Sequence, residues 1–158
     1  MQVPQADRHA AVPWPPILVG AVLAGGVLLG RLYPLAWPGM DDLPARIVGY
    51  GIGAAGIALV AWGFLTLWRA GTTIMPNQRA DRLVTEGAFR FRRNPIYMGE
   101  VLIFLGLAEL THNIWFAILA PLLAITLYVL AIRPEEQHLE TRFGQAYLDY
   151  KGRTRRWF

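Results

Sequence analysis

Long apolar runs alternate with polar stretches along the chain. Four runs are visible, at 17–33, 47–68, 95–110 and 114–132, and the second and fourth contain no charged residue. As helices with a rise of about 1.5 Å per residue, these two runs extend about 33 and 28 Å, close to the roughly 30 Å hydrocarbon core of a bilayer. We therefore predict an all-α, polytopic membrane protein with four transmembrane helices, in a single membrane domain that covers residues 1–158.

The last two runs lie close together in the sequence. Only Thr111, His112 and Asn113 separate them, so we predict that they form a tight C-terminal helical hairpin. Glu109 lies just before this turn, and we expect its carboxylate to be solvated at the membrane surface.

The polar tail after the hairpin predicts a further helix. Pro134 suits a first helical position, and Glu135 and Glu136 then complement the helix dipole in the first turn. Beyond them, apolar residues recur at spacings typical of one helix face: Leu139, Phe143, Tyr147 and Tyr150. We predict an amphipathic helix on the cytoplasmic membrane surface, which Gly144 bends or ends early.

Basic residues are concentrated in two segments. Segments 69–94 and 133–158 each carry six, whereas loop 34–46 carries one Arg against two Asp and the 111–113 turn carries none. Cytoplasmic loops of membrane proteins are enriched in Lys and Arg. With four crossings, this bias places both basic segments and both termini on the cytoplasmic side of an inner or cell membrane, with the first run retained as a helix.

The composition narrows the chemistry further. The chain is 54% hydrophobic and only 16% charged, with a net charge of +4 and no cysteine. The absence of cysteine excludes disulfides, thiolate catalysis and Cys-based metal sites. His9, His112 and His138 lie in separate segments, so we predict no metal site. Basic residues that flank membrane helices favour lipid phosphates over nucleic acid as partners.

Glycines in the second run admit two interpretations. Gly51, Gly53 and Gly56 match the spacing of a dinucleotide-binding loop. A true dinucleotide-binding loop follows a strand and is followed by an acidic residue. In this chain the pattern instead lies inside an uncharged membrane run. Close helix packing in the membrane is the better interpretation.

Candidate chemistry begins at the start of the third run. Asn94 and Pro95 form a favourable helix start, and the free N–H groups of such a start suit a carboxylate. Tyr97 lies in the first turn of this helix. It is either a site residue or one of the aromatic residues that line the membrane surface. The alternation of Phe89 and Phe91 with arginines equally fits a strap in the lipid headgroups.

Glu100 is a carboxylate inside a membrane run. Such groups are costly and are candidates for function. The structural alternatives are that its side chain reaches the interface or pairs with an arginine of 90–93.

Two stretches carry a recognisable pattern. The first precedes the hairpin and contains Leu83, Val84, Thr85, Gly87, Phe89, Arg93, Asn94, Pro95, Tyr97 and Gly99. The second follows it and contains Glu135, Glu136, Leu139, Phe143, Gly144, Tyr147 and Tyr150. In this order around two apolar helices, they resemble the isoprenylcysteine carboxyl methyltransferase and phospholipid methyltransferase family of integral membrane enzymes.

The resemblance implies S-adenosylmethionine as cofactor, bound without a Rossmann fold at the cytoplasmic end of the hairpin. It implies contacts from these residues: Asp81, Arg82, Leu83, Val84, Phe89, Asn94, Pro95, Ile96, Tyr97 and Glu135. Arg133 and Glu136 are the candidates for binding the substrate. The family usually has His where Asn94 stands, and the Asn side chain cannot accept a proton at neutral pH.

The predicted activity is methyl transfer to an amphiphilic or lipid-like acceptor at the cytoplasmic face, with the acceptor atom (O, N or S) left open. The alternative is a non-enzymatic four-helix membrane protein, such as a small transporter with Glu100 as its coupling carboxylate. The sequence leaves the oligomeric state undetermined.

Overall fold

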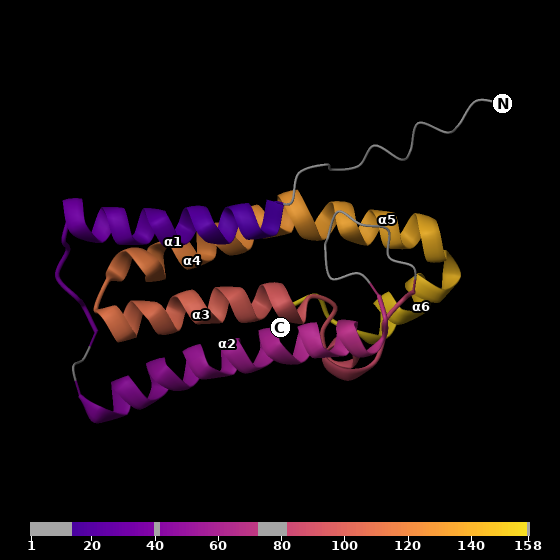
Figure 1. Ribbon diagram of the computed structural model, residues 1–158, viewed down its shortest axis with the longest axis horizontal. Coiled ribbons are helices and arrows are strands. Elements are labelled where there is room, and N and C mark those ends of the chain that lie inside the picture. The colour runs from indigo at the N-terminus through magenta and orange to yellow at the C-terminus, as the bar shows by residue number, and fades with distance from the viewer. Residues whose placement is uncertain (1–13, 40–41, 73–81, 158) are drawn as a thin grey trace.

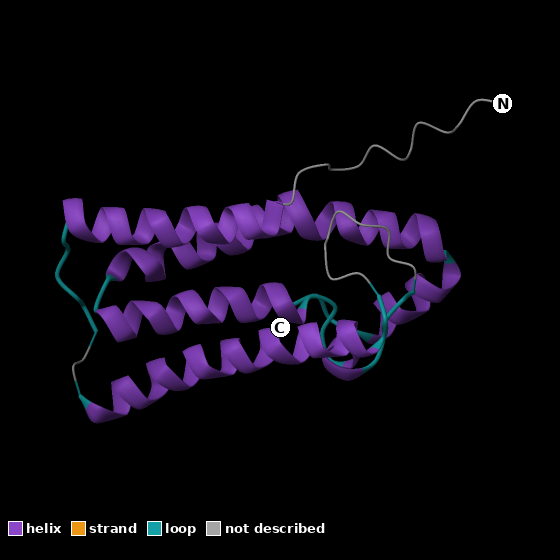
Figure 2. Ribbon diagram, viewed as in Figure 1, coloured by secondary structure: helices purple, strands orange, loops and turns teal. Residues whose placement is uncertain are grey.

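Four long helices lie side by side along the molecule (Figure 1). The computed structural model describes residues 14–39, 42–72 and 82–157. The long helices are α1 (Trp14–Leu32), α2 (Leu43–Arg69), α3 (Pro95–Thr111) and α4 (Ile114–Leu127). Within the described residues, the only β-type pairing is an isolated bridge between Arg92 and Arg155, so the fold is all-α as predicted (Figure 2).

Three helices are long and apolar enough to cross a membrane. They are α1, α2 and the continuous helix Ile114–Phe143, which begins with α4. The chain is thus an all-α membrane protein. α3 has 17 residues and carries Glu100 and Glu109, so it is too short to belong to these three helices. That α3 crosses the membrane remains a prediction. It nevertheless lies alongside α2 and α4 in the bundle (Figure 1).

Glycines bring α2 and α3 into close contact. A Cβ on Gly106 of α3 would lie 2.4 Å from the Cα of Gly53 on α2. One Cβ on Gly56 would lie 2.7 Å from the carbonyl oxygen of Gly99. Small residues of this kind let helix backbones approach closely in lipid. The glycine pattern of the second run therefore serves helix packing.

The core of the bundle lies between α3 and α4. Its buried members are mostly large apolar side chains: Tyr97, Phe104, Ala108, Phe116, Ala120, Leu123, Leu127, Ala131 and Ile132. Many apolar side chains on the outer faces remain exposed, among them Leu28, Ile57 and Ile125. Exposed apolar surface on this scale is typical of a protein whose solvent is lipid.

The predicted hairpin joins α3 to α4. His112 ends α3 in the left-handed region, at φ 48°, and the side chain of Asn113 caps α4 by accepting from the Trp115 N–H at 3.1 Å. The Asn113 amide also donates to the Gly26 carbonyl at 2.9 Å. This bond ties the hairpin to α1.

Glu109 departs from the prediction that it is solvated. Its side chain is buried beside α2, where a Cβ on Gly49 would meet the Glu109 Cγ at 2.3 Å. The oxygen Oε1 is buried without a hydrogen-bond partner. Glycine at position 49 creates this space, and the sequence pattern of α3 alone does not show it.

The tail departs from the prediction in shape. α4 continues through a π-helical turn (η3, Tyr128–Ile132) directly into α5 (Arg133–Phe143). Pro134 therefore lies within a continuous helix, and the wider turn before it accommodates a residue without an N–H. As predicted, Gly144 ends α5 early, with φ 52°, and a second helix, α6 (Gln145–Arg153), follows it.

Candidate functional site

Segments that are distant in sequence meet at one end of the bundle, where α2 and α4 end and α3 begins (Figure 1). A short 3₁₀ helix (η2, Gly87–Arg90) precedes α3 and packs on the end of α2. There the Ala88 N–H donates to the Thr66 hydroxyl at 3.4 Å. Gly87 has φ +57°, and a Cβ at this position would clash with Thr66. Glycine is thus required for both conformation and space.

Tyr97 and Glu135 form the polar centre of this end. The Tyr97 hydroxyl, from the first turn of α3, donates to Glu135 Oε2 at 3.0 Å. Glu135 comes from the first turn of α5. An ionised carboxylate offers about four acceptor positions. Tyr97 occupies one, so Glu135 retains capacity for a ligand.

Asn94 adds a second polar group. It occupies the N-cap position of α3, but its side chain makes no capping bond. The residue is buried, and its Nδ2 has no hydrogen-bond partner. A buried amide without a partner is costly, so this donor is a candidate for ligand binding.

A cluster of charged side chains lies beside Tyr97 and Glu135. We define the clamp as Arg93, Glu136 and Arg156. Arg93 Nε donates to Glu136 Oε1 at 3.1 Å, and Arg156 Nε donates to the same oxygen at 3.0 Å. Arg156 Nη2 also bonds the second oxygen, Oε2. The clamp therefore joins the start of α3, the start of α5 and the C-terminal segment.

The C-terminal segment is held along the chain that leads into α3. The Arg93 N–H donates to the Arg155 carbonyl at 2.9 Å. The Arg93 guanidinium donates to the Lys151 carbonyl at 3.0 Å and to the Thr154 carbonyl. These bonds close the end of the bundle on the side of α6.

Two tyrosines of α6 complete this packing. The Tyr150 hydroxyl donates to the Phe89 carbonyl at 2.7 Å. Burial raises the pKa of Tyr150 to about 12 and also raises the pKa of Tyr147. Both hydroxyls therefore stay protonated, and Tyr150 remains a donor.

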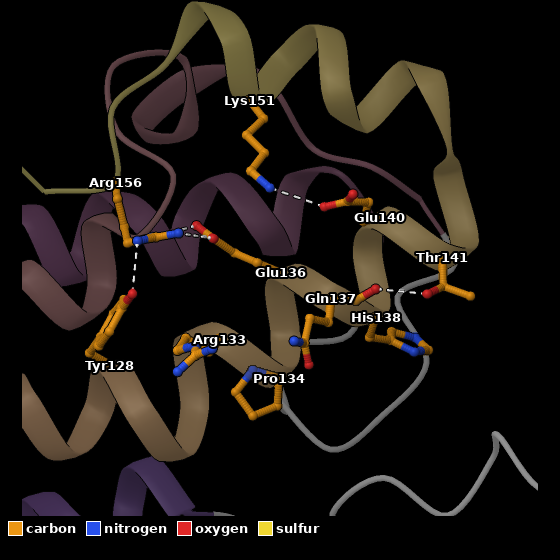
Figure 3. Close-up of a pocket in the computed structure, with 10 residues that line it drawn as sticks. All are labelled: Tyr128, Arg133, Pro134, Glu136, Gln137, His138, Glu140, Thr141, Lys151 and Arg156. Atoms are coloured by element: carbon orange, nitrogen blue, oxygen red, sulfur yellow. Dashed lines mark hydrogen bonds and ion pairs between the residues drawn. The ribbon is translucent and has the colours of Figure 1, made fainter.

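A cavity of about 710 Å³ opens next to the clamp (Figure 3). Its lining residues come from the π turn, α5, α6 and the C-terminal segment: Tyr128, Arg133, Pro134, Glu136, Gln137, His138, Glu140, Thr141, Lys151 and Arg156. Figure 3 shows Arg156 reaching between Tyr128 and Glu136 on one side of it. Lys151 bonds Glu140 at 3.0 Å on another side.

The residues predicted to bind the cofactor divide into three groups. Tyr97, Glu135, Asn94 and Pro95 lie at the helix starts described above. Ile96 instead faces α2, since a Cβ on Gly63 would lie 2.5 Å from the Ile96 Cγ1.

The remaining candidates lie in the segment before α3. Phe89, Leu83 and Val84 are half-buried and Arg82 is exposed. Asp81 lies outside the described residues. No hydrogen bond or ion pair in the described part of the chain joins Arg82 to Glu135.

The two substrate candidates differ in surroundings. Arg133 is exposed, with its guanidinium carbon 6.0 Å from the centre of the Tyr128 ring. Both oxygens of Glu136 are held by guanidinium groups, so we assign it to the clamp and leave Arg133 as the proposed substrate contact.

Glu100 does not pair with the arginines of 90–93. Arg93 bonds Glu136 instead, and Glu100 Oε2 is buried without a hydrogen-bond partner. Glu100 lies three residues after Tyr97 on α3. It is thus an uncompensated polar group near the candidate site.

Arg156 and Tyr128 belong to this end of the bundle although the sequence pattern does not indicate them. The sequence favours lipid phosphates as partners of the C-terminal arginines, and Tyr128 lies within an apolar run. The only available signal is charge pairing. A buried Glu136 carboxylate needs a basic partner, and the C-terminal arginines could supply it. Among the described residues, no group of three or more His, Cys, Asp or Glu side chains is arranged to hold a metal ion.

Family comparison agrees with this architecture. The model of the phospholipid methyltransferase family matches residues 44–146. The chain therefore belongs to this family. Residues 82–97 and Glu135, which frame the site, lie within the match.

A curated relative is known by a different name. The chain is 28% identical over 151 residues to the cobalt-zinc-cadmium resistance protein CzcN of Cupriavidus metallidurans. The match covers 96% of this chain and 64% of that protein, so the chain spans less than two thirds of the relative. No solved structure matches.

Proposed function

We propose that the protein is an S-adenosylmethionine-dependent methyltransferase that acts on an amphiphilic, lipid-like acceptor at the cytoplasmic face of the membrane. The observation that supports this most is the Tyr97–Glu135 pair, at 3.0 Å, at the end of an apolar bundle. It places a carboxylate and an aromatic ring where a water-soluble cation can meet an acceptor from the bilayer.

The residues present fit such a cofactor. Bound there, S-adenosylmethionine supplies an electrophilic methyl group on a sulfonium cation. The Glu135 carboxylate can accept charge-assisted hydrogen bonds from an ammonium or from ribose hydroxyls. The Tyr97 ring can face a cation. The Asn94 amide, buried without a partner, can donate to a carboxylate or to a ring nitrogen.

The protein's contribution to the reaction is positioning and exclusion of water. Asn94 cannot act as a base at neutral pH, so no step depends on proton transfer at that position. An in-line displacement gains most from holding the reacting groups in line in a dry site. The apolar core around Tyr97 supplies the dry side, and the clamp holds the start of α5 beside the start of α3.

The acceptor is proposed to enter sideways from the bilayer. The outer faces of the helices are apolar and exposed, whereas the exposed Arg133 lies by the cavity. An amphiphile can therefore keep its tail in lipid and bring its polar end to this arginine. O, N and S acceptors all fit this arrangement.

Binding and methyl transfer test the proposal together. Purified wild-type protein should bind S-adenosylmethionine by calorimetry, and Tyr97→Phe should bind about three- to tenfold more weakly, since it loses one hydrogen bond. Tyr50→Phe, on the exposed face of α2, is the matched control and should bind like wild type. Membranes given donor labelled in the methyl group should carry label in a lipid extract. A wild-type protein that neither binds donor nor transfers label would refute the proposal and favour the transporter alternative with Glu100.

We also propose that the end carrying segment 82–94 and α5 faces the cytoplasm. Twelve of the 15 basic residues lie in segments 69–94 and 133–158, and the clamp joins these segments at one end of the bundle.

The cysteine-free chain makes the orientation simple to test. A single cysteine replacing Glu86 should react with a membrane-impermeant thiol reagent only after the cells are opened, and one replacing Leu35 should react in intact cells. The reverse pattern would contradict the orientation.

A further inference from the structure

The C-terminal segment after α6 makes specific contacts with the rest of the chain. Thr154 Oγ1 donates to the Tyr150 carbonyl at 2.8 Å, and Arg155 forms the isolated bridge with Arg92. Trp157 packs against the bundle core that includes Tyr97. The segment is therefore fixed on both sides of Arg156, and it lies outside the region 44–146 that matches the family.

Arg156 connects the first residue of the π turn to the first turn of α5. Its guanidinium lies 5.1 Å from the centre of the Tyr128 ring and donates to the Tyr128 hydroxyl at 3.4 Å. It also binds both oxygens of Glu136. Tyr128 begins the turn and Glu136 lies in the first turn of α5. Arg156 thus spans the helix segment in between.

That segment is the least regular part of the helix. A π turn has longer hydrogen-bond rings than an α-helix, and Pro134 supplies no N–H to the ladder. The direction of α5 relative to α4 therefore depends on contacts from outside the helix. Arg156 is such a contact, and its side chain is 30% exposed while that of Glu136 is only 8% exposed.

Glu135 depends on that direction. It is the neighbour of Glu136, and its carboxylate must reach the Tyr97 hydroxyl on α3. Arg93, the residue before Asn94, is held by the same Glu136 carboxylate. One carboxylate therefore fixes the approach of α5 to the start of α3.

We propose that Arg156 is a positioning residue: by holding Glu136 across the π turn, it orients Glu135 toward Tyr97 and the donor site. The role rests on the proposed function as far as donor binding is concerned. The orientation of α5 itself can be tested without any donor.

The test compares substitutions within the same segment. Arg156→Gln should weaken S-adenosylmethionine binding about tenfold, since small displacements of a binding group are costly. Arg156→Lys keeps the charge but loses the two-pronged bond, and should recover part of the affinity. Arg155→Gln removes the same charge from an exposed residue and should stay within about twofold of wild type.

A double-mutant cycle separates positioning from general destabilisation. In a Glu135→Ala background, Arg156→Gln should change donor affinity by less than about twofold, because Arg156 acts through Glu135. An equal loss in both backgrounds, or wild-type affinity in Arg156→Gln alone, would overturn the proposal.

Amide hydrogen exchange gives a readout that needs no donor. The backbone amides of Arg133 and of residues 135–139 should exchange faster in Arg156→Gln than in wild type or Arg155→Gln, since local opening follows the loss of tertiary contacts. Unchanged exchange would overturn the positioning role even if the wild type binds no donor. Failure of wild-type binding would refute the proposed function separately.

Discussion

Replacing Glu135 with alanine should weaken S-adenosylmethionine binding about 100-fold and reduce methyl transfer at limiting donor accordingly. A hydrogen bond to a charged group contributes about 1.5–3 kcal/mol, and each 1.4 kcal/mol is tenfold in affinity. Glu135 is the partner of the Tyr97 hydroxyl at 3.0 Å, so its loss removes the acceptor for the ligand and for Tyr97 together. Calorimetry on detergent-purified protein measures the effect.

Two further variants separate charge from folding. Glu135→Gln keeps an acceptor for Tyr97 but loses the negative charge, and should lie between wild type and Glu135→Ala. Asp149→Asn removes a carboxylate from the exposed face of α6 and should bind like wild type. A Glu135→Ala protein with wild-type affinity would remove Glu135 from the donor site.

Gly106→Ala should give the largest loss of stability among single-methyl additions to the bundle. Its Cβ would lie 2.4 Å from Gly53 Cα and 2.9 Å from Gly53 N, and both of these are backbone atoms that cannot rotate away. Overpacking of this kind costs about 1–3 kcal/mol. Thermal unfolding in detergent should therefore show a clearly lowered Tm.

Gly51→Ala is the matched control on the facing helix. A Cβ at Gly51 meets nothing within 4 Å, and alanine is favoured over glycine in a helix interior by up to about 1 kcal/mol. Its Tm should equal or exceed that of wild type. Equal Tm values for Gly106→Ala and Gly51→Ala would mean that α2 and α3 do not pack as described.

The helices were predictable because lipid imposes long apolar runs. The all-α membrane fold follows from those runs, and the hairpin at 111–113 follows from their spacing. The glycines of α2 also indicated helix packing correctly. Which helix they meet was not predictable, because the partner glycines, Gly99 and Gly106, lie on a helix interrupted by two carboxylates.

The errors concern one contact between distant segments and the course of the helix around Pro134. Glu109 is buried because Gly49 leaves room for it. Pro134 suggested a helix start, whereas the π turn lets the helix continue through it.

The candidate site was predictable in part. The resemblance to the methyltransferase family implied Tyr97 and Glu135, and they form a hydrogen bond across 38 residues of sequence. Arg156 was not chosen, because a basic C-terminus has the same composition whether it binds lipid or an internal carboxylate. Only the burial of Glu136 distinguishes the two.

The π turn at Tyr128–Ile132 bears on how relatives of this chain are to be compared. A π turn takes in one residue more than an α turn. A homologue with one residue fewer before its acidic pair can therefore present that pair on the same face from an unbroken α-helix. A one-residue gap at this point of an alignment therefore leaves the acidic pair in the same place. Searches that require a fixed spacing between the hairpin and the acidic pair will overlook true members of the family.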